Sequence, residues 1–169
     1  ILDALDKAIG SCKKRRQEAV YLLSELSDVP DVVERIGHWL NDPDSQWRHW
    51  LIQTVEQSGL KRCAPLLNGI IENDPDPSCR APGIHAAGAL RADENLPALL
   101  RLAKGGDYDQ SWELAWALKD YATEDCRPYL KRWFEDDGQD KHARVIAAWG
   151  LGKLGDKRAI AYLVQMLDD

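Results

Sequence analysis

The amino-acid sequence predicts an all-α protein, a right-handed α-solenoid of about five helix pairs. The first observation is a recurring anchor position, which is followed by apolar residues at offsets of three, four and seven. That spacing places them on one face of a helix. The anchors are Arg16, Arg48, Arg80, Ser111 and Arg144, with steps of 32, 32, 31 and 33 residues. The second observation is that each helix pair has an uncovered apolar face. Stacked copies of the pair would bury it.

We divide residues 1–169 into one domain of five units, at about 10–41, 42–73, 74–104, 105–136 and 137–169. Residues 1–9 are expected to be the second helix of a preceding unit. The first helix of unit one opens near Arg16 and ends at Ser27-Asp28-Val29-Pro30, and 31–40 form its partner. The apolar character of both chain ends predicts that the chain is a fragment of a longer array.

The second unit is expected to form helices over about 45–58 and 60–72, after a turn at 41–45. In the third unit, Pro82 falls in the first helical turn, where its missing N–H is tolerated. Gly105-Gly106-Asp107 opens the fourth unit, and Asp137-Gly138 precedes the fifth. Gly155-Asp156 then separates the last two helices, because Gly ends a helix and Asp begins one.

These residues resemble the short HEAT-like repeats of phycobilisome lyases. Asp42-Pro43-Asp44 and 74–77 match the entry of that repeat, and its second helix has a Pro near the start, as at Pro65, Pro97 and Pro128. The resemblance covers roughly 10–169, and Ser111 departs from it by replacing the anchor Arg. It implies a right-handed superhelix whose second helices line the concave side.

An Asp lies four residues before each of the last four anchors, at Asp44, Asp76, Asp107 and Asp140. An Asp at that position can cap its own helix by accepting backbone N–H groups. The anchor guanidinium can reach the Asp of the neighbouring unit as a forked donor. We therefore interpret Arg48, Arg80 and Arg144, with these aspartates, as a structural ladder between repeats.

Composition and motifs favour a non-catalytic protein. The formal net charge of −6 gives no general attraction to nucleic acid, and no apolar run is long enough for a membrane span. Four scattered cysteines without a C-x-x-C pair fit a reduced, cytoplasmic setting. The His-Glu pairs that hold iron in HEAT-like hydroxylases are missing after every anchor. His38, His49, His85 and His142 have no metal-ligand spacing. We expect no metal and no cofactor.

Tryptophan is the residue type that suggests a binding surface, since the chain has seven Trp and one Phe. The offsets of one and five after each anchor lie outside the apolar stripe and would align down one side of the stacked helices. We predict that Trp112 and Trp116 are partly exposed. The predicted binding residues are Trp112, Trp116, Trp149, His85, His49, Trp50 and Tyr21. The alternative is that Trp at offset five packs against the neighbouring unit.

The favoured function is a non-catalytic scaffold that binds a protein or peptide through an extended solenoid surface. The alternative is a subunit of a phycobilin-lyase-like enzyme that acts on a carrier protein, which the resemblance implies. The partner cannot be named from the sequence, because a fold alone does not imply a function.

Overall fold

The computed structural model describes residues 18, 21, 29–105 and 111–167. The expected helix over 1–9, the anchor Arg16 and the capping Asp107 lie outside these residues.

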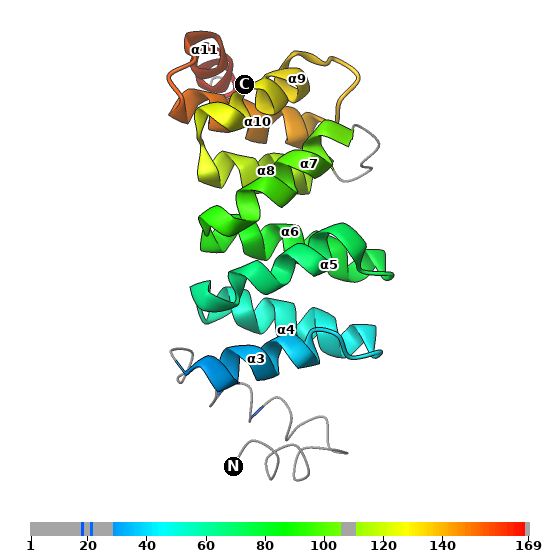
Figure 1. Ribbon diagram of the computed structural model, residues 1–169. Coiled ribbons are helices and arrows are strands. Elements are labelled where there is room, and N and C mark those ends of the chain that lie inside the picture. The colour runs from blue at the N-terminus through cyan, green and yellow to red at the C-terminus, as the bar shows by residue number, and fades with distance from the viewer. Residues whose placement is uncertain (1–17, 19–20, 22–28, 106–110, 168–169) are drawn as a thin grey trace.

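The described residues form α-helices and short 3₁₀ turns, without a strand. The all-α solenoid predicted from the sequence is therefore confirmed (Figure 1). The helices are α3 (Pro30–Trp39), α4 (Ser45–Gln57), α5 (Leu67–Asn73), α6 (Pro77–Leu90), α7 (Leu96–Gly105), α8 (Ser111–Tyr121), α9 (Arg127–Glu135), α10 (Lys141–Lys153) and α11 (Lys157–Gln165). Short 3₁₀ turns at Lys61–Leu66, Asp93–Asn95 and Glu124–Cys126 precede α5, α7 and α9.

The helices form two layers. The first helices of the units, α4, α6, α8 and α10, pack directly on one another (Figure 1). The second helices α5, α7 and α9 pack mainly on the first helix of the following unit, and α11 packs on α10. The apolar stripe lies between the layers, as its helical spacing predicts. Its fully buried members include Leu51, Ile52, Ile84, Ala87, Leu114, Leu118, Ala147 and Leu151.

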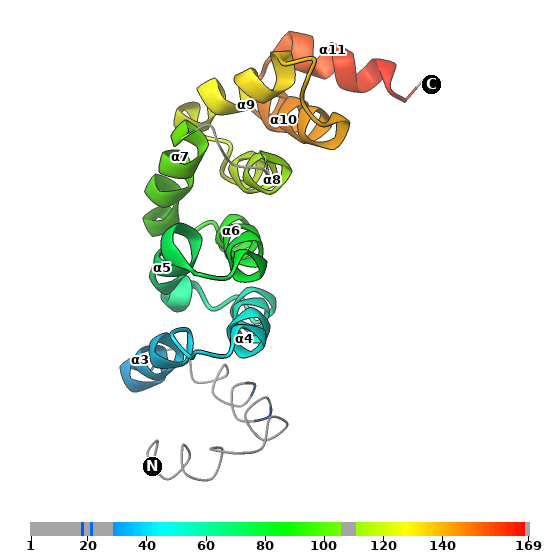
Figure 2. The same cartoon turned by 90° about the vertical axis from the view of Figure 1, so that its right-hand side faces the viewer.

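The curvature differs from the expectation. Figure 2 shows the first helices α4, α6, α8 and α10 on the inner side of the arc and α5, α7 and α9 on the outer side. The second helices therefore do not line the concave side. Small residues explain the difference, because they let the first helices approach closely: a Cβ added to Gly88 would lie only 2.6 Å from the Cα of Ala117. The second helices carry Leu, Trp and Phe and make far fewer contacts with one another.

Aspartate side chains define where several helices begin. Asp44 accepts the N–H groups of Gln46 and Trp47 at the start of α4. Asp140 and Asp156 accept backbone N–H groups in the same way at the starts of α10 and α11. The capping role that the sequence predicted for Asp44 and Asp140 is present, and these caps set the direction in which each helix leaves its turn.

Candidate functional site

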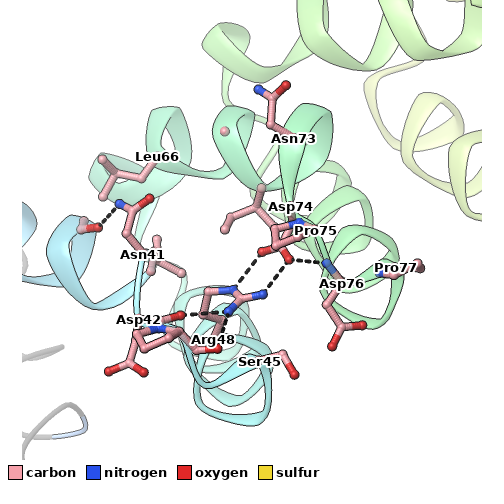
Figure 3. A pocket seen from close by; sticks show the side chains of 15 residues that line it. Asn41, Asp42, Ser45, Arg48, Leu66, Asn73, Asp74, Pro75, Asp76 and Pro77 are labelled. Carbon is pink, nitrogen blue, oxygen red and sulfur yellow. Dashed lines mark hydrogen bonds and ion pairs between the residues drawn. The ribbon is translucent and has the colours of Figure 1, made fainter.

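A cleft of about 900 Å³ lies where the first three units meet, among α3, α5 and the turns that precede α4 and α6 (Figure 3). Arg48 lies at this cleft, almost fully buried. Its Nε and Nη2 donate to the two carboxylate oxygens of Asp74 at 2.9 and 2.7 Å. Its Nη1 donates to the carbonyl oxygens of Asp42 and Pro43. These bonds occupy the guanidinium, so this cleft is a structural joint between repeats.

The partner of Arg48 corrects the predicted ladder. The guanidinium reaches the next unit, but it binds Asp74 and not Asp76. Asp76 instead caps α6 by accepting the N–H of Ser78. Hydrogen bonds from Ser45 and Ser78 lower the pKa of Asp76 to about 2. Because the carboxylate of Asp76 already accepts these capping bonds, Arg48 binds the carboxylate of Asp74, two residues earlier.

The described contacts of Arg80 and Arg144 differ from those of Arg48. Arg144 forms an ion pair at 3.0 Å with Asp137 of its own unit, and its guanidinium lies 5.9 Å from the Tyr162 ring. The Nε of Arg80 is buried and has no hydrogen-bond acceptor in the described part of the chain. Among the described residues, the predicted anchor arginines form an arginine-to-aspartate bond between units at Arg48.

Three rings on successive first helices lie in contact. We call His85 of α6, Trp116 of α8 and Trp149 of α10 the aromatic ladder. The ring centroids of His85 and Trp116 are 6.2 Å apart, and the two ring planes are nearly parallel. Those of Trp116 and Trp149 are also 6.2 Å apart, in an edge-to-face arrangement. All three residues occupy offset five after their anchors, so the structure brings together the positions that the sequence pattern aligned.

A lysine that the sequence analysis did not single out lies against the aromatic ladder. The Nζ of Lys119 is 4.0 Å from the ring centroid of Trp116 and 4.3 Å from that of Trp149. Lys119 is 3% exposed and forms an ion pair with Asp120 at 2.9 Å. The Nζ of Lys153 donates to the carbonyl oxygen of Lys119 at 3.0 Å. The two indoles thus shield a buried ammonium, which is a structural task for Trp116 in particular.

Acidic groups lie at the other end of the aromatic ladder. The Nδ1 of His85 is 2.9 Å from Oε1 of Glu56. Glu113 is buried, and burial raises the pKa of its carboxyl group. These contacts follow the repeat spacing. The residue eight positions after one anchor contacts the residue five positions after the next anchor, as in Glu56 with His85 and Lys119 with Trp149.

The predicted binding residues differ in their exposure and in their contacts. Trp112 is 44% exposed and lies on α8 one turn before Trp116, and Trp149 is 46% exposed. His49 and Trp50 have other contacts: the Nδ1 of His49 is 2.9 Å from the carbonyl oxygen of Ser78, and Trp50 stacks on Trp47. Tyr21 is helical and exposed. Trp116 is half-buried, so neither Trp112 nor Trp116 is enclosed between repeats.

The described residues contain no group of three or more His, Cys, Asp or Glu that could hold a metal ion. No helix among them combines the length and the apolar character that a membrane span requires. Cys63, Cys79 and Cys126 are buried free thiols.

Comparison with known proteins supports a HEAT-like repeat protein. Residues 96–169, which contain α7 to α11, match the family described as HEAT repeats. That segment is less than half of the chain, and the match does not specify the phycobilisome-lyase subtype. No curated protein matches the chain. Together, the fold and the match describe a solenoid whose C-terminal part is similar to HEAT repeats.

Proposed function

We propose that this protein is a non-catalytic scaffold that binds a protein or peptide along the inner surface of its first helices. Arrays of stacked helix pairs characteristically present extended concave surfaces for binding. The proposed binding face is centred on Trp112, Trp116 and Trp149, with His85 beside them.

The observation that carries this proposal is the pair of half-exposed indoles, Trp112 and Trp149, beside the aromatic ladder. Trp is enriched at protein interfaces, and charged residues are depleted at interface centres. The side chains at offsets one and five in the last four units fit that description, since none is Asp, Glu, Lys or Arg. They are His49, Gln53, Ala81, His85, Trp112, Trp116, Val145 and Trp149.

A purely structural role explains these residues less well. Trp116 is half-buried and covers Lys119, as a packing residue would. Trp149 also contacts Lys119, yet nearly half of its surface stays exposed, and Trp112 is exposed to the same extent. Because large apolar side chains gain free energy by burial, two exposed indoles on adjacent helices favour a surface that a partner covers.

Selection from a displayed library of short random peptides tests this function. We expect the wild-type protein to enrich peptides whose affinity falls by about 2 kcal/mol or more in Trp149→Ala, the size of an interface hot spot. Trp149 is chosen over Trp116 because more of its surface is exposed, so its truncation disturbs less of the packing, although both rings contact Lys119. Arg101→Ala is the matched control, because Arg101 is an exposed residue of the outer helix α7 that pairs with Glu72. Equal binding by wild type and Trp149→Ala would refute the proposed face.

A further inference from the structure

The charged groups at the α10 end of the aromatic ladder are unequal in number. Two ammonium groups, Lys119 and Lys153, share one carboxylate oxygen, Oδ1 of Asp120, at 2.9 and 3.8 Å. Their formal charges leave this cluster with one excess positive charge. It lies directly beside the exposed ring of Trp149, 5.7 Å from Nζ of Lys153.

The indoles at this end are poorly suited to bind a cation from outside. Aromatic rings attract cations through their faces. Here the rings of Trp116 and Trp149 already contact the ammonium of Lys119. A second cation placed there would be repelled by Lys119 and Lys153, so the surface favours neutral or anionic groups.

Lys153 is positioned to receive an anion. Its side chain is 35% exposed, and within the described part of the chain its short hydrogen bond goes to an uncharged group, the carbonyl oxygen of Lys119. An ammonium has three N–H donors, and the carboxylate of Asp120 lies beyond hydrogen-bond length from it. A carboxylate can therefore bind Lys153 while a neighbouring apolar side chain covers Trp149.

We propose that the partner segment carries a carboxylate next to an apolar side chain, and that Lys153 and Trp149 bind this pair. This inference rests on the proposed function and specifies the chemistry of its partner. The other end of the aromatic ladder gives the segment a direction, because the carboxylate of Glu56, paired with His85, disfavours a second acid there. The chain as a whole carries a net charge of −6 and repels acids at long range, so the attraction is local.

Peptides selected on the wild-type protein provide the probe. Those that bind through Trp149 should contain Asp or Glu beside an apolar residue. We then replace that acid by its amide and measure affinity by fluorescence anisotropy in about 0.15 M salt, where distant charges are screened. The amide should weaken binding to the wild-type protein about tenfold, the typical effect of losing one charge-assisted hydrogen bond.

Two lysine variants make the measurement specific. In Lys153→Met the same acid-to-amide change should alter affinity less than about twofold, because the two changes remove one interaction. Lys141→Met removes an equal charge from an exposed residue of α10 and should behave like the wild type. Melting curves from circular dichroism establish that both variants stay folded.

The outcomes separate this inference from the proposed function. Selected peptides that need Trp149 but show no acid preference, or prefer Lys and Arg, would refute carboxylate recognition and leave the scaffold function standing. An unchanged acid preference in Lys153→Met would refute the role of Lys153. If no peptide is enriched by the wild-type protein, both proposals fail.

Discussion

Replacing Gly88 by Ala tests the close contact between α6 and α8. An added Cβ would lie 2.6 Å from the Cα of Ala117 and 2.9 Å from its Cβ. Carbon atoms in contact prefer a separation of about 3.5 Å or more. The two helices would therefore have to move apart by about 1 Å, since the obstacle is helix backbone that cannot rotate away.

The two effects of this substitution oppose each other. Ala is favoured over Gly inside a helix by about 1 kcal/mol. Overpacking a core costs about 1–3 kcal/mol, and contact with backbone places Gly88→Ala at the upper end of that range. We expect a net loss of about 2 kcal/mol in the free energy of unfolding.

Gly69→Ala is the matched control, because a Cβ at Gly69 in α5 would meet nothing within 4 Å. It should stabilise the protein by about 0.5–1 kcal/mol, through helix propensity alone. Urea denaturation followed by circular dichroism measures both variants, and a shift of the midpoint at constant slope reports stability. A midpoint for Gly88→Ala at or above that of the wild type would refute the close packing of α6 on α8.

Three further predictions concern the joint, a thiol and the array. Arg48→Met should cost about 3–5 kcal/mol in urea denaturation, because it leaves the carboxylate of Asp74 buried without its cation; the double variant with Asp74→Leu should recover much of that loss. Burial raises the pKa of the Cys63 thiol to about 11, so at pH 8 this cysteine should resist iodoacetamide until urea unfolds the chain, and rapid alkylation in the native protein would contradict its burial. Deleting 137–169 should leave a shorter folded helical protein, since stability in stacked repeats is close to additive; complete loss of helix by circular dichroism would contradict independent units.

The helices and the core were predictable from the sequence because both depend on local patterns. Leu51, Ile52 and Val55 follow Arg48 at helical spacing, and all three are fully buried. The turn at Gly155 was likewise predictable, since its φ of +82° is a backbone conformation that glycine adopts without strain. Such features follow from the backbone and from apolar burial, and require no knowledge of the neighbouring unit.

The choice of partner for Arg48 was harder to predict because the next unit begins with two aspartates, Asp74 and Asp76, and the repeat spacing does not distinguish between them. Asp76 lies where an N-cap is expected, and the capping bonds engage its carboxylate. Asp74 lies before that turn and accepts the N–H of Asp76, which orients its carboxylate toward Arg48. In an Asp-Pro-Asp entry, local capping therefore decides which Asp remains for the contact between repeats.

The candidate site depends on distances between units, which spacing alone does not supply. The predicted alignment of His85, Trp116 and Trp149 needed only the repeat period. The burial of Lys119 among the rings requires the first helices to be close, whereas the resemblance implies that they lie on the convex side, where neighbouring helices are spread apart.

Side-chain size would have indicated the curvature. The first helices carry Gly88, Ala117 and Gly150 where they meet, and they make far more contacts with one another than the second helices do. The layer with the smaller side chains can approach more closely, so the array bends toward that layer. The bend and the aromatic ladder therefore have one cause.

That common cause links stability to binding. Because α6 carries His85 and α8 carries Trp116, separating these helices by about 1 Å would lengthen the 6.2 Å contact between their rings. Gly88→Ala should therefore weaken the binding of any ligand that spans His85 and Trp116, although Gly88 is itself buried. Gly69→Ala, which affects only the outer layer, should leave the same binding unchanged. Equal affinities for these two variants would show that the aromatic ladder does not depend on the spacing of the first helices.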